Sequence, residues 1–175
     1  HVGFLHGIFE ETLPGRTEAQ EELKGRLLAR DYVGYRDLLR RLGLSEPLRR
    51  ELEDILRLRG GREICEQALA VSPSRSAAQA VRHLCGVWEA LEAYGAADNV
   101  LIDLTMTGDF NYYTGVTFEG YASDLGFPVL SGGRYDNLLA QFGRPAPATG
   151  FALKTNRILE YVAASGAAPP EGPRR

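Results

Sequence analysis

The residues best suited to bind a small polar ligand lie in two short runs of the sequence: Tyr112, Tyr113, Gly132, Gly133, Arg134 and Tyr135. A tyrosine hydroxyl both donates and accepts hydrogen bonds, and its ring can close one wall of a pocket. Glycines leave backbone N–H groups accessible, and a guanidinium pairs with a carboxylate or a phosphate. The set therefore suits an amino-acid-like ligand.

Tyr112 and Tyr113 are adjacent, so on an extended chain their rings face opposite sides and only one of them enters a given pocket. We expect Tyr113 to point inward and to bind an imidazole or an amine. The alternative is that both are sheet tyrosines with hydrated hydroxyls. Glu119 is a polar residue in a strand with apolar neighbours, and it either binds an ammonium group or faces water.

Residues 131–134, Ser-Gly-Gly-Arg, are expected to form a turn with exposed N–H groups just before a helix. Such a turn receives a carboxylate or a phosphate, although Gly-Gly is also common in hairpins. Asp136 is then a first-turn residue favoured by the helix dipole. Arg157 lies near the start of the last predicted helix, where a cation is unfavourable. It therefore indicates an anionic partner, or an ordinary surface salt bridge.

No nucleophile or metal site emerges from the sequence. His1, His6 and His83 are scattered, and the sequence has neither a nucleophile elbow nor a phosphate-binding loop of the P-loop type. Cys65 and Cys85 lack C-x-x-C spacing, so we interpret both as reduced, packed thiols. No cofactor is predicted.

Composition narrows the classes of partner. The chain has 20 Lys and Arg against 23 Asp and Glu, a net charge of -3, which gives no basic field to attract nucleic acid. No apolar run approaches the roughly 20 residues that cross a bilayer, and no signal-peptide pattern is present. The expectation is a cytoplasmic protein without a membrane or nucleic-acid partner.

Helical periodicity dominates the first half of the chain. Helix starts are predicted at a Thr17 cap, at Asp31 and at Ser45, each followed by apolar residues at helical spacing. Two further helices are predicted at residues 62–71 and 76–94, so this half reads as an amphipathic bundle.

After Gly95 the apolar period changes from 3.6 to 2, which indicates strands. The expected strands are residues 100–107, 115–122, 127–130 and 148–153. The expected helices are residues 135–142 and 155–164, and residues 165–175 are expected to be a disordered tail. Strands this closely spaced favour an antiparallel sheet and an α+β fold.

Three ordered motifs resemble the C-terminal half of the histidyl-tRNA synthetase catalytic core. They are Asn-Tyr-Tyr-Thr-Gly-Val-Thr-Phe-Glu-Gly from residue 111, Ser-Gly-Gly-Arg-Tyr-Asp-Asn-Leu-Leu from residue 131, and Ala-Thr-Gly-Phe-Ala-Leu from residue 148, closing on Arg157. The resemblance is strong over residues 98–163 and loose over the preceding helices. It implies a partial domain with a class II aminoacyl-tRNA synthetase-like antiparallel sheet and flanking helices. Residues 98–164 would be half of that core, preceded by a helical insertion at residues 1–97.

Two positions depart from the synthetase pattern. Gly108 stands where the synthetases carry a catalytic arginine, and Lys154 stands where they carry a glycine that admits adenine. Loss of such an electrostatic group costs about 3 kcal/mol or more of transition-state stabilisation. The resemblance therefore implies that adenylate formation is lost, with Arg157 left as a vestige of the nucleotide site.

A synthetase-like core without activation chemistry resembles the regulatory subunits of ATP phosphoribosyltransferase, which act in histidine biosynthesis. This resemblance implies that Tyr113 and Tyr135 line an L-histidine imidazole site, shaped by Tyr112, Gly132, Gly133 and Arg134. It also implies a homodimer that assembles with the catalytic subunit of ATP phosphoribosyltransferase, transmits histidine feedback and has no turnover alone. The alternatives are a fragment of an active histidyl-tRNA synthetase and a helical interaction module joined to an unrelated α+β domain.

Overall fold

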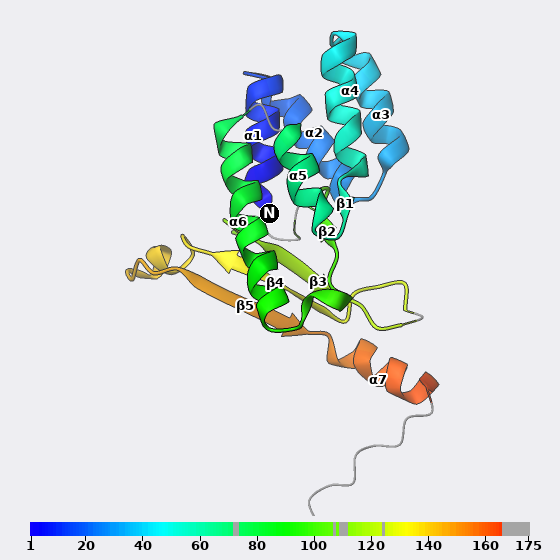
Figure 1. Cartoon of the computed structure of the whole chain (residues 1–175), viewed down its shortest axis with the longest axis vertical. Helices are drawn as coiled ribbons and strands as arrows, with labels where there is room; N and C mark the ends of the chain where they lie inside the picture. Colours follow the sequence, from blue (N-terminus) through cyan, green and yellow to red (C-terminus); the bar gives the residue numbers. More distant parts are fainter. Residues whose placement is uncertain (72–73, 107, 109–111, 124, 166–175) are drawn as a thin grey trace, which may run out of the picture.

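The computed structural model describes residues 1–71, 74–106, 108, 112–123 and 125–165. Helices group on one side of a small sheet, and a further helix, α7 (Thr155–Ser165), follows the last strand (Figure 1). The helices of the group are α1 (Val2–Thr12), α2 (Thr17–Leu28), α3 (Tyr32–Arg41), α4 (Glu46–Asp54), α5 (Glu63–Ala70) and α6 (Arg75–Ala93). Short 3-10 turns lie at Ile55–Arg57, Ala97–Asn99 and Leu139–Phe142.

The core of the helical group forms where α1 packs along α6. Phe4, Ile8 and Phe9 of α1 are fully buried, and Val81 of α6 is nearly so. Burying each such side chain stabilises the fold by about 1.5–3 kcal/mol. The sequence analysis did not predict α1, although its apolar residues recur at helical spacing.

Local capping signals were partly right. Asp31 caps α3 as predicted, because its carboxylate accepts a hydrogen bond from the Gly34 N–H at 2.8 Å. Ser45 occupies the N-cap position of α4 but makes no side-chain capping bond. The predicted Thr17 cap is wrong, because Thr17 is already the first helical residue and Arg16 precedes it at the N-cap.

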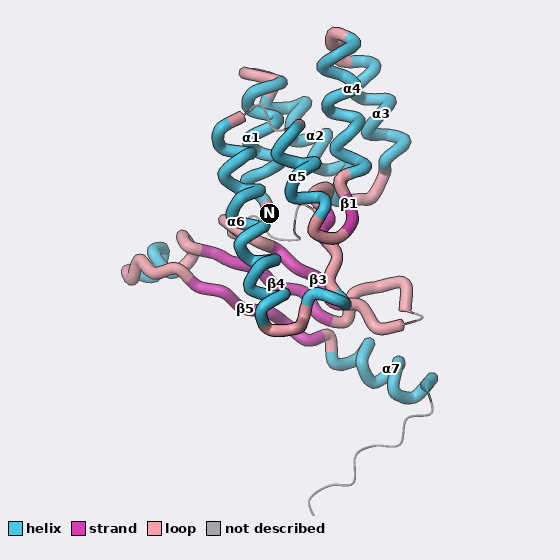
Figure 2. Tube along the Cα trace, viewed as in Figure 1, coloured by secondary structure: helices cyan, strands magenta, loops and turns pink. Residues whose placement is uncertain are grey.

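The three-stranded sheet is antiparallel with the order β3-β4-β5, and a two-stranded ladder lies between it and the helices (Figure 2). The strands of the larger sheet are β3 (Thr117–Gly120), β4 (Leu130–Tyr135) and β5 (Ala148–Leu153). The ladder pairs β1 (Arg59–Gly60) with β2 (Ile102–Asp103). The α+β class with an antiparallel sheet is confirmed.

The predicted helix at residues 135–142 is wrong, because β4 continues through Tyr135 and only the turn at Leu139–Phe142 follows. The predicted strand at 127–130 is also misplaced, since β4 begins at Leu130. Hydrogen bonding to β3 and β5 on both sides carries the strand through the glycines that looked like a turn. In the expected strand 100–107, only Ile102–Asp103 pairs, and residue 107 lies outside the described part.

The last predicted helix is confirmed as α7, while residues 166–175 of the expected tail lie outside the described residues. No helix in the described part of the chain is both long enough and apolar enough to cross a membrane.

Candidate ligand-binding site

Three tyrosine rings meet on one face of the larger sheet. The ring centroid of Tyr112 lies 4.8 Å from that of Tyr113 and 5.4 Å from that of Tyr135, and Tyr113 lies 6.5 Å from Tyr135. The expectation that Tyr112 and Tyr113 face opposite sides was wrong, because Tyr112 lies in a turn rather than on an extended strand. We call these three residues the tyrosine cluster.

Two glycines form the floor beneath these rings. Gly133 of β4 pairs with Gly150 of β5, so both positions present the same face of the sheet. A Cβ on Gly133 would lie 2.8 Å from Cδ1 of the Tyr113 ring, and one on Gly150 would lie 2.7 Å from the Tyr135 hydroxyl oxygen. These glycines are therefore needed for the rings to approach the sheet.

Gly132 and Arg134 project from the opposite face, because neighbouring residues of a strand alternate. A Cβ on Gly132 would lie 2.6 Å from Cβ of Phe151 and 2.7 Å from Cζ of Phe118. Arg134 donates from Nε to the Asp136 carboxylate at 2.9 Å. The structure thus places Gly133 and Tyr135 with the tyrosine cluster and places Gly132 and Arg134 behind it.

The predicted anion-binding turn at residues 131–134 is absent from the described structure, because these residues are paired within β4. Asp136 is likewise outside any helix. Its N–H donates to Thr114 Oγ1 at 2.9 Å, which ties the chain after β4 to the segment before β3.

A β-bulge turns the tyrosine pair toward the sheet. The N–H groups of Thr114 and Gly115 both donate to the Arg134 carbonyl, at 2.9 and 3.4 Å, and the Arg134 N–H donates to the Val116 carbonyl at 2.8 Å. Two residues therefore oppose one, which bends the strand and re-aims the side chains that precede it. The turn at Tyr112 and the bulge that follows it together explain why simple strand alternation failed there.

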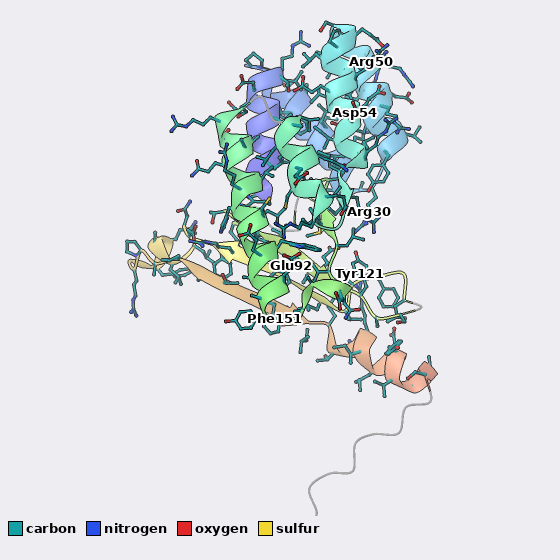
Figure 3. The ribbon with its side chains drawn as sticks, viewed as in Figure 1. Arg30, Arg50, Asp54, Glu92, Tyr121 and Phe151 are labelled. Atoms are coloured by element: carbon teal, nitrogen blue, oxygen red, sulfur yellow. The ribbon has the colours of Figure 1, made fainter. Side chains whose placement is uncertain are left out.

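A hollow opens between the end of α2 and the same face of the sheet. We call it the Arg30 hollow, and it is lined by Leu27, Leu28, Arg30, Tyr32, Asp103, Thr105, Met106, Gly108 and Glu119. Arg30 donates from Nη2 to Glu119 Oε2 at 3.2 Å and to the Tyr121 hydroxyl oxygen at 2.9 Å (Figure 3). Thr105 donates from its hydroxyl to Asp103 at 2.6 Å. Glu119 thus binds Arg30, a residue that the sequence analysis did not single out.

Gly108 joins the Arg30 hollow to the tyrosine cluster. It has a φ of 77°, and a Cβ there would lie 3.0 Å from Cγ2 of Thr117 and 3.1 Å from Cδ2 of Tyr113. Thr117 itself is 8% exposed, and its Oγ1 has no hydrogen-bond partner among the described residues. An unpaired buried hydroxyl is unusual, and this one lies at the junction between the Arg30 hollow and the tyrosine cluster.

The model of the family "Histidyl-tRNA synthetase" matches residues 1–158. The chain belongs to the histidyl-tRNA synthetase family. The curated ATP phosphoribosyltransferase regulatory subunit of Bacillus licheniformis is 45% identical over 93% of this chain and 41% of its own length. The Bacillus subtilis protein of the same name is 42% identical over the same shares. The chain thus spans about two fifths of the length of these curated relatives.

Solved structures agree with the family assignment. A Bacillus halodurans protein described as an ATP phosphoribosyltransferase regulatory subunit/histidyl-tRNA synthetase superposes with a TM-score of 0.87 at 39% identity. The match covers 91% of this chain and 42% of that one. The histidyl-tRNA synthetase of Nostoc sp. PCC 7120 has a TM-score of 0.77 at 20% identity, a likeness in fold. The class II synthetase-like fold expected from the sequence is confirmed.

Arg157, the residue assigned to a vestigial nucleotide site of this family, contacts other groups of the chain. It donates from Nη1 to the Pro128 carbonyl at 2.8 Å, and its guanidinium carbon lies 4.6 Å from the centroid of the Phe127 ring. These contacts hold α7 against the segment before β4. The nucleotide role of Arg157 stays a prediction.

Proposed function

We propose that this chain is the synthetase-like part of an ATP phosphoribosyltransferase regulatory subunit, that it binds L-histidine and that it has no turnover of its own. The observation that carries the proposal is the tyrosine cluster on its glycine floor beside Gly108. The cluster offers aromatic walls for a planar ring, while position 108 carries no charge. The name shared by the curated Bacillus relatives supports the same function.

The chemistry of imidazole suits such a cluster. A neutral imidazole has one nitrogen that donates and one that accepts, and a tyrosine hydroxyl serves either one. Aromatic rings prefer tilted or edge-on neighbours, which is how Tyr112, Tyr113 and Tyr135 already lie relative to one another. Adenylate formation additionally needs fixed positive charge at the reacting phosphate, and glycine at position 108 supplies none.

The proposal extends to assembly and location. The whole protein would form a homodimer in the cytoplasm, bind the catalytic subunit of ATP phosphoribosyltransferase and transmit histidine feedback to it. Residues 1–97 would serve as a helical insertion and residues 98–164 as part of the synthetase-like core.

Calorimetric titration of L-histidine into the full-length protein tests the binding function. We expect saturable binding by the wild type and a loss of about tenfold or more in affinity for Tyr135→Ala, because a wall and a hydroxyl are removed. Tyr94→Ala is the matched control, since Tyr94 at the end of α6 is 88% exposed. Thermal unfolding of each variant checks that it folds. Absence of histidine binding by the folded wild type contradicts the proposal.

Histidine-dependent exchange of pyrophosphate into ATP separates this function from that of a synthetase. No exchange above background is expected for the full-length protein. Robust exchange would instead assign the chain to an active histidyl-tRNA synthetase.

A further inference from the structure

We propose that Arg30, at the end of α2, binds the carboxylate of the amino-acid ligand whose ring lies in the tyrosine cluster. The inference rests on the proposed histidine-binding function and adds a residue from the helical side to that site. It makes the Arg30 hollow the subsite for the α-carboxylate and α-ammonium groups.

The first argument is that the hollow and the cluster share one face of the sheet. Thr117 pairs with Gly133 and Glu119 pairs with Ser131, so all four positions present the same face. The Tyr113 ring covers Gly133 on this face, and Arg30 binds Glu119 on it. Gly108 lines the hollow and would touch Tyr113 if it carried a Cβ, so the two spaces meet at that glycine.

The second argument concerns charge. A carboxylate leaving water needs a cation and hydrogen-bond donors. Arg30 is the basic residue among those that line the hollow. Arg134 projects from the other face of the sheet, and Arg157 contacts the segment before β4, so neither of them lines the hollow.

The third argument is the backbone at Arg30, which has a φ of 56°. Its N–H donates to the Leu27 carbonyl at 3.0 Å, and the Asp31 N–H donates to the Arg26 carbonyl at 2.8 Å. This is the Schellman pattern that ends a helix, in which glycine is the usual residue at the left-handed position. An arginine there is unfavourable for the backbone, so its presence indicates a use for its side chain.

The remaining polar groups match a zwitterion. Both hydrogen bonds of Arg30 within the described part of the chain use Nη2, which leaves Nη1 to donate to a ligand. The side chains of Glu119 and Asp103 are only 16% and 17% exposed and line the same hollow. Carboxylates so placed attract the α-ammonium group, which lies next to the α-carboxylate in any amino acid.

Titration of the full-length protein with L-histidine and with histamine, which lacks the carboxylate, tests the assignment. We expect Arg30→Gln to weaken L-histidine binding by about tenfold or more and histamine binding by less than about twofold. Arg50→Gln is the matched control, because Arg50 on α4 is 72% exposed and pairs only with Glu46 among the described residues. It should leave both affinities unchanged.

A second variant guards against a folding defect. Arg30→Gly places the favoured residue at the left-handed position, which offsets the loss of the Arg30–Glu119 ion pair. Its melting temperature should therefore stay close to that of the wild type, while its affinity for L-histidine falls like that of Arg30→Gln. Equal loss of both ligands in a folded variant, or unchanged L-histidine binding, overturns the carboxylate assignment and leaves the proposed function standing. A wild type that binds neither ligand contradicts the proposed function itself.

Discussion

The hydroxyl oxygen of Tyr135 lies 2.7 Å from the point at which a Cβ would project from Gly150. The next nearest atoms of that tyrosine, Cζ and Cε1, are 3.6 and 3.7 Å away, so only the end of the side chain is crowded. The glycine on β5 therefore fixes where the tyrosine from β4 places its polar atom. The strand pairing of the sheet and the geometry of the proposed imidazole site are linked at this contact.

Gly150→Ala should displace the Tyr135 hydroxyl without unfolding the protein. Because the crowded atom is at the end of a rotatable side chain, we expect the free energy of unfolding to change by less than about 1 kcal/mol. We expect L-histidine affinity to fall by about fivefold or more, since the hydroxyl leaves its position. Urea unfolding and calorimetry measure the two effects, and unchanged affinity would show that Tyr135 does not bind the ligand through its hydroxyl.

Gly133→Ala is the contrasting substitution. Its Cβ would lie 2.8 Å from two Tyr113 ring atoms and 2.8 Å from the Val116 carbonyl oxygen, which belongs to the backbone. Because the backbone must also move, we expect a loss of about 1–3 kcal/mol in the free energy of unfolding, larger than for Gly150→Ala. Urea unfolding of both variants under the same conditions measures which one loses more free energy of unfolding. A larger loss for Gly150→Ala than for Gly133→Ala would contradict this account of the glycines beneath the tyrosine rings.

Gly108→Arg should not create synthetase activity. Position 108 has a φ of 77°, and a Cβ there would crowd Thr117 at 3.0 Å and Tyr113 at 3.1 Å. A left-handed non-glycine residue costs roughly 1–2 kcal/mol, so we expect a less stable protein with a disturbed tyrosine cluster. Pyrophosphate exchange should stay at background, while chemical unfolding reports the loss. Gain of exchange together with unchanged stability would refute this reasoning.

Thr117→Val tests the unpaired hydroxyl between Gly108 and the tyrosine cluster. Valine keeps the branched shape and removes a buried polar atom that has no partner among the described residues. Such an atom costs about 1–3 kcal/mol when it is left unsatisfied, so the ligand-free protein should become more stable by about 1 kcal/mol. Binding of L-histidine should weaken if the hydroxyl serves the ligand. A destabilised variant would show that the hydroxyl already has a partner in the free protein.

Short-range signals in the sequence predicted short-range structure well. Asp31 followed by an apolar period correctly predicted the start of α3, because a cap depends on the residues immediately around it. The helix predicted at residues 76–94 is confirmed as α6, in which Trp88 is 7% exposed and donates from its indole N–H to Glu92 at 2.8 Å. The resemblance in residues 111–153 correctly indicated the family and its fold, because it rested on three motifs in order.

Strand pairing and contacts between residues far apart in the sequence could not be predicted from these short-range signals. The glycines of β4 read as a turn from their own neighbourhood, and only hydrogen bonding with β3 and β5 makes them a strand. That pairing also places Gly133 on the face of the sheet that carries the tyrosine cluster and Arg134 on the other face. The order of the residues in the sequence does not decide which of the two lies on which face. Arg30 contacts Glu119 from a distant part of the sequence, so no motif indicated it. One sequence signal for Arg30 was available. This arginine stands just before the helix-capping Asp31, at the position where glycine usually ends the preceding helix.

The two cysteines offer a prediction that does not depend on the ligand. Burial, together with a hydrogen bond to Cys85, raises the pKa of the Cys65 thiol from its ordinary value to about 12. A raised pKa keeps the thiol protonated, and the thiolate is the reactive form. In folded protein the alkylation rate of Cys65 should therefore keep rising with pH beyond pH 10.

In urea the alkylation rate should reach half of its maximum at about pH 8.5, the ordinary pKa of a thiol. At pH 8 the folded protein should react at least about 100-fold more slowly than the unfolded one, measured by mass spectrometry of the Cys65 peptide after iodoacetamide treatment. If the alkylation rate of the folded protein is half-maximal below about pH 9.5, Cys65 is more accessible than its packing between α5 and α6 indicates.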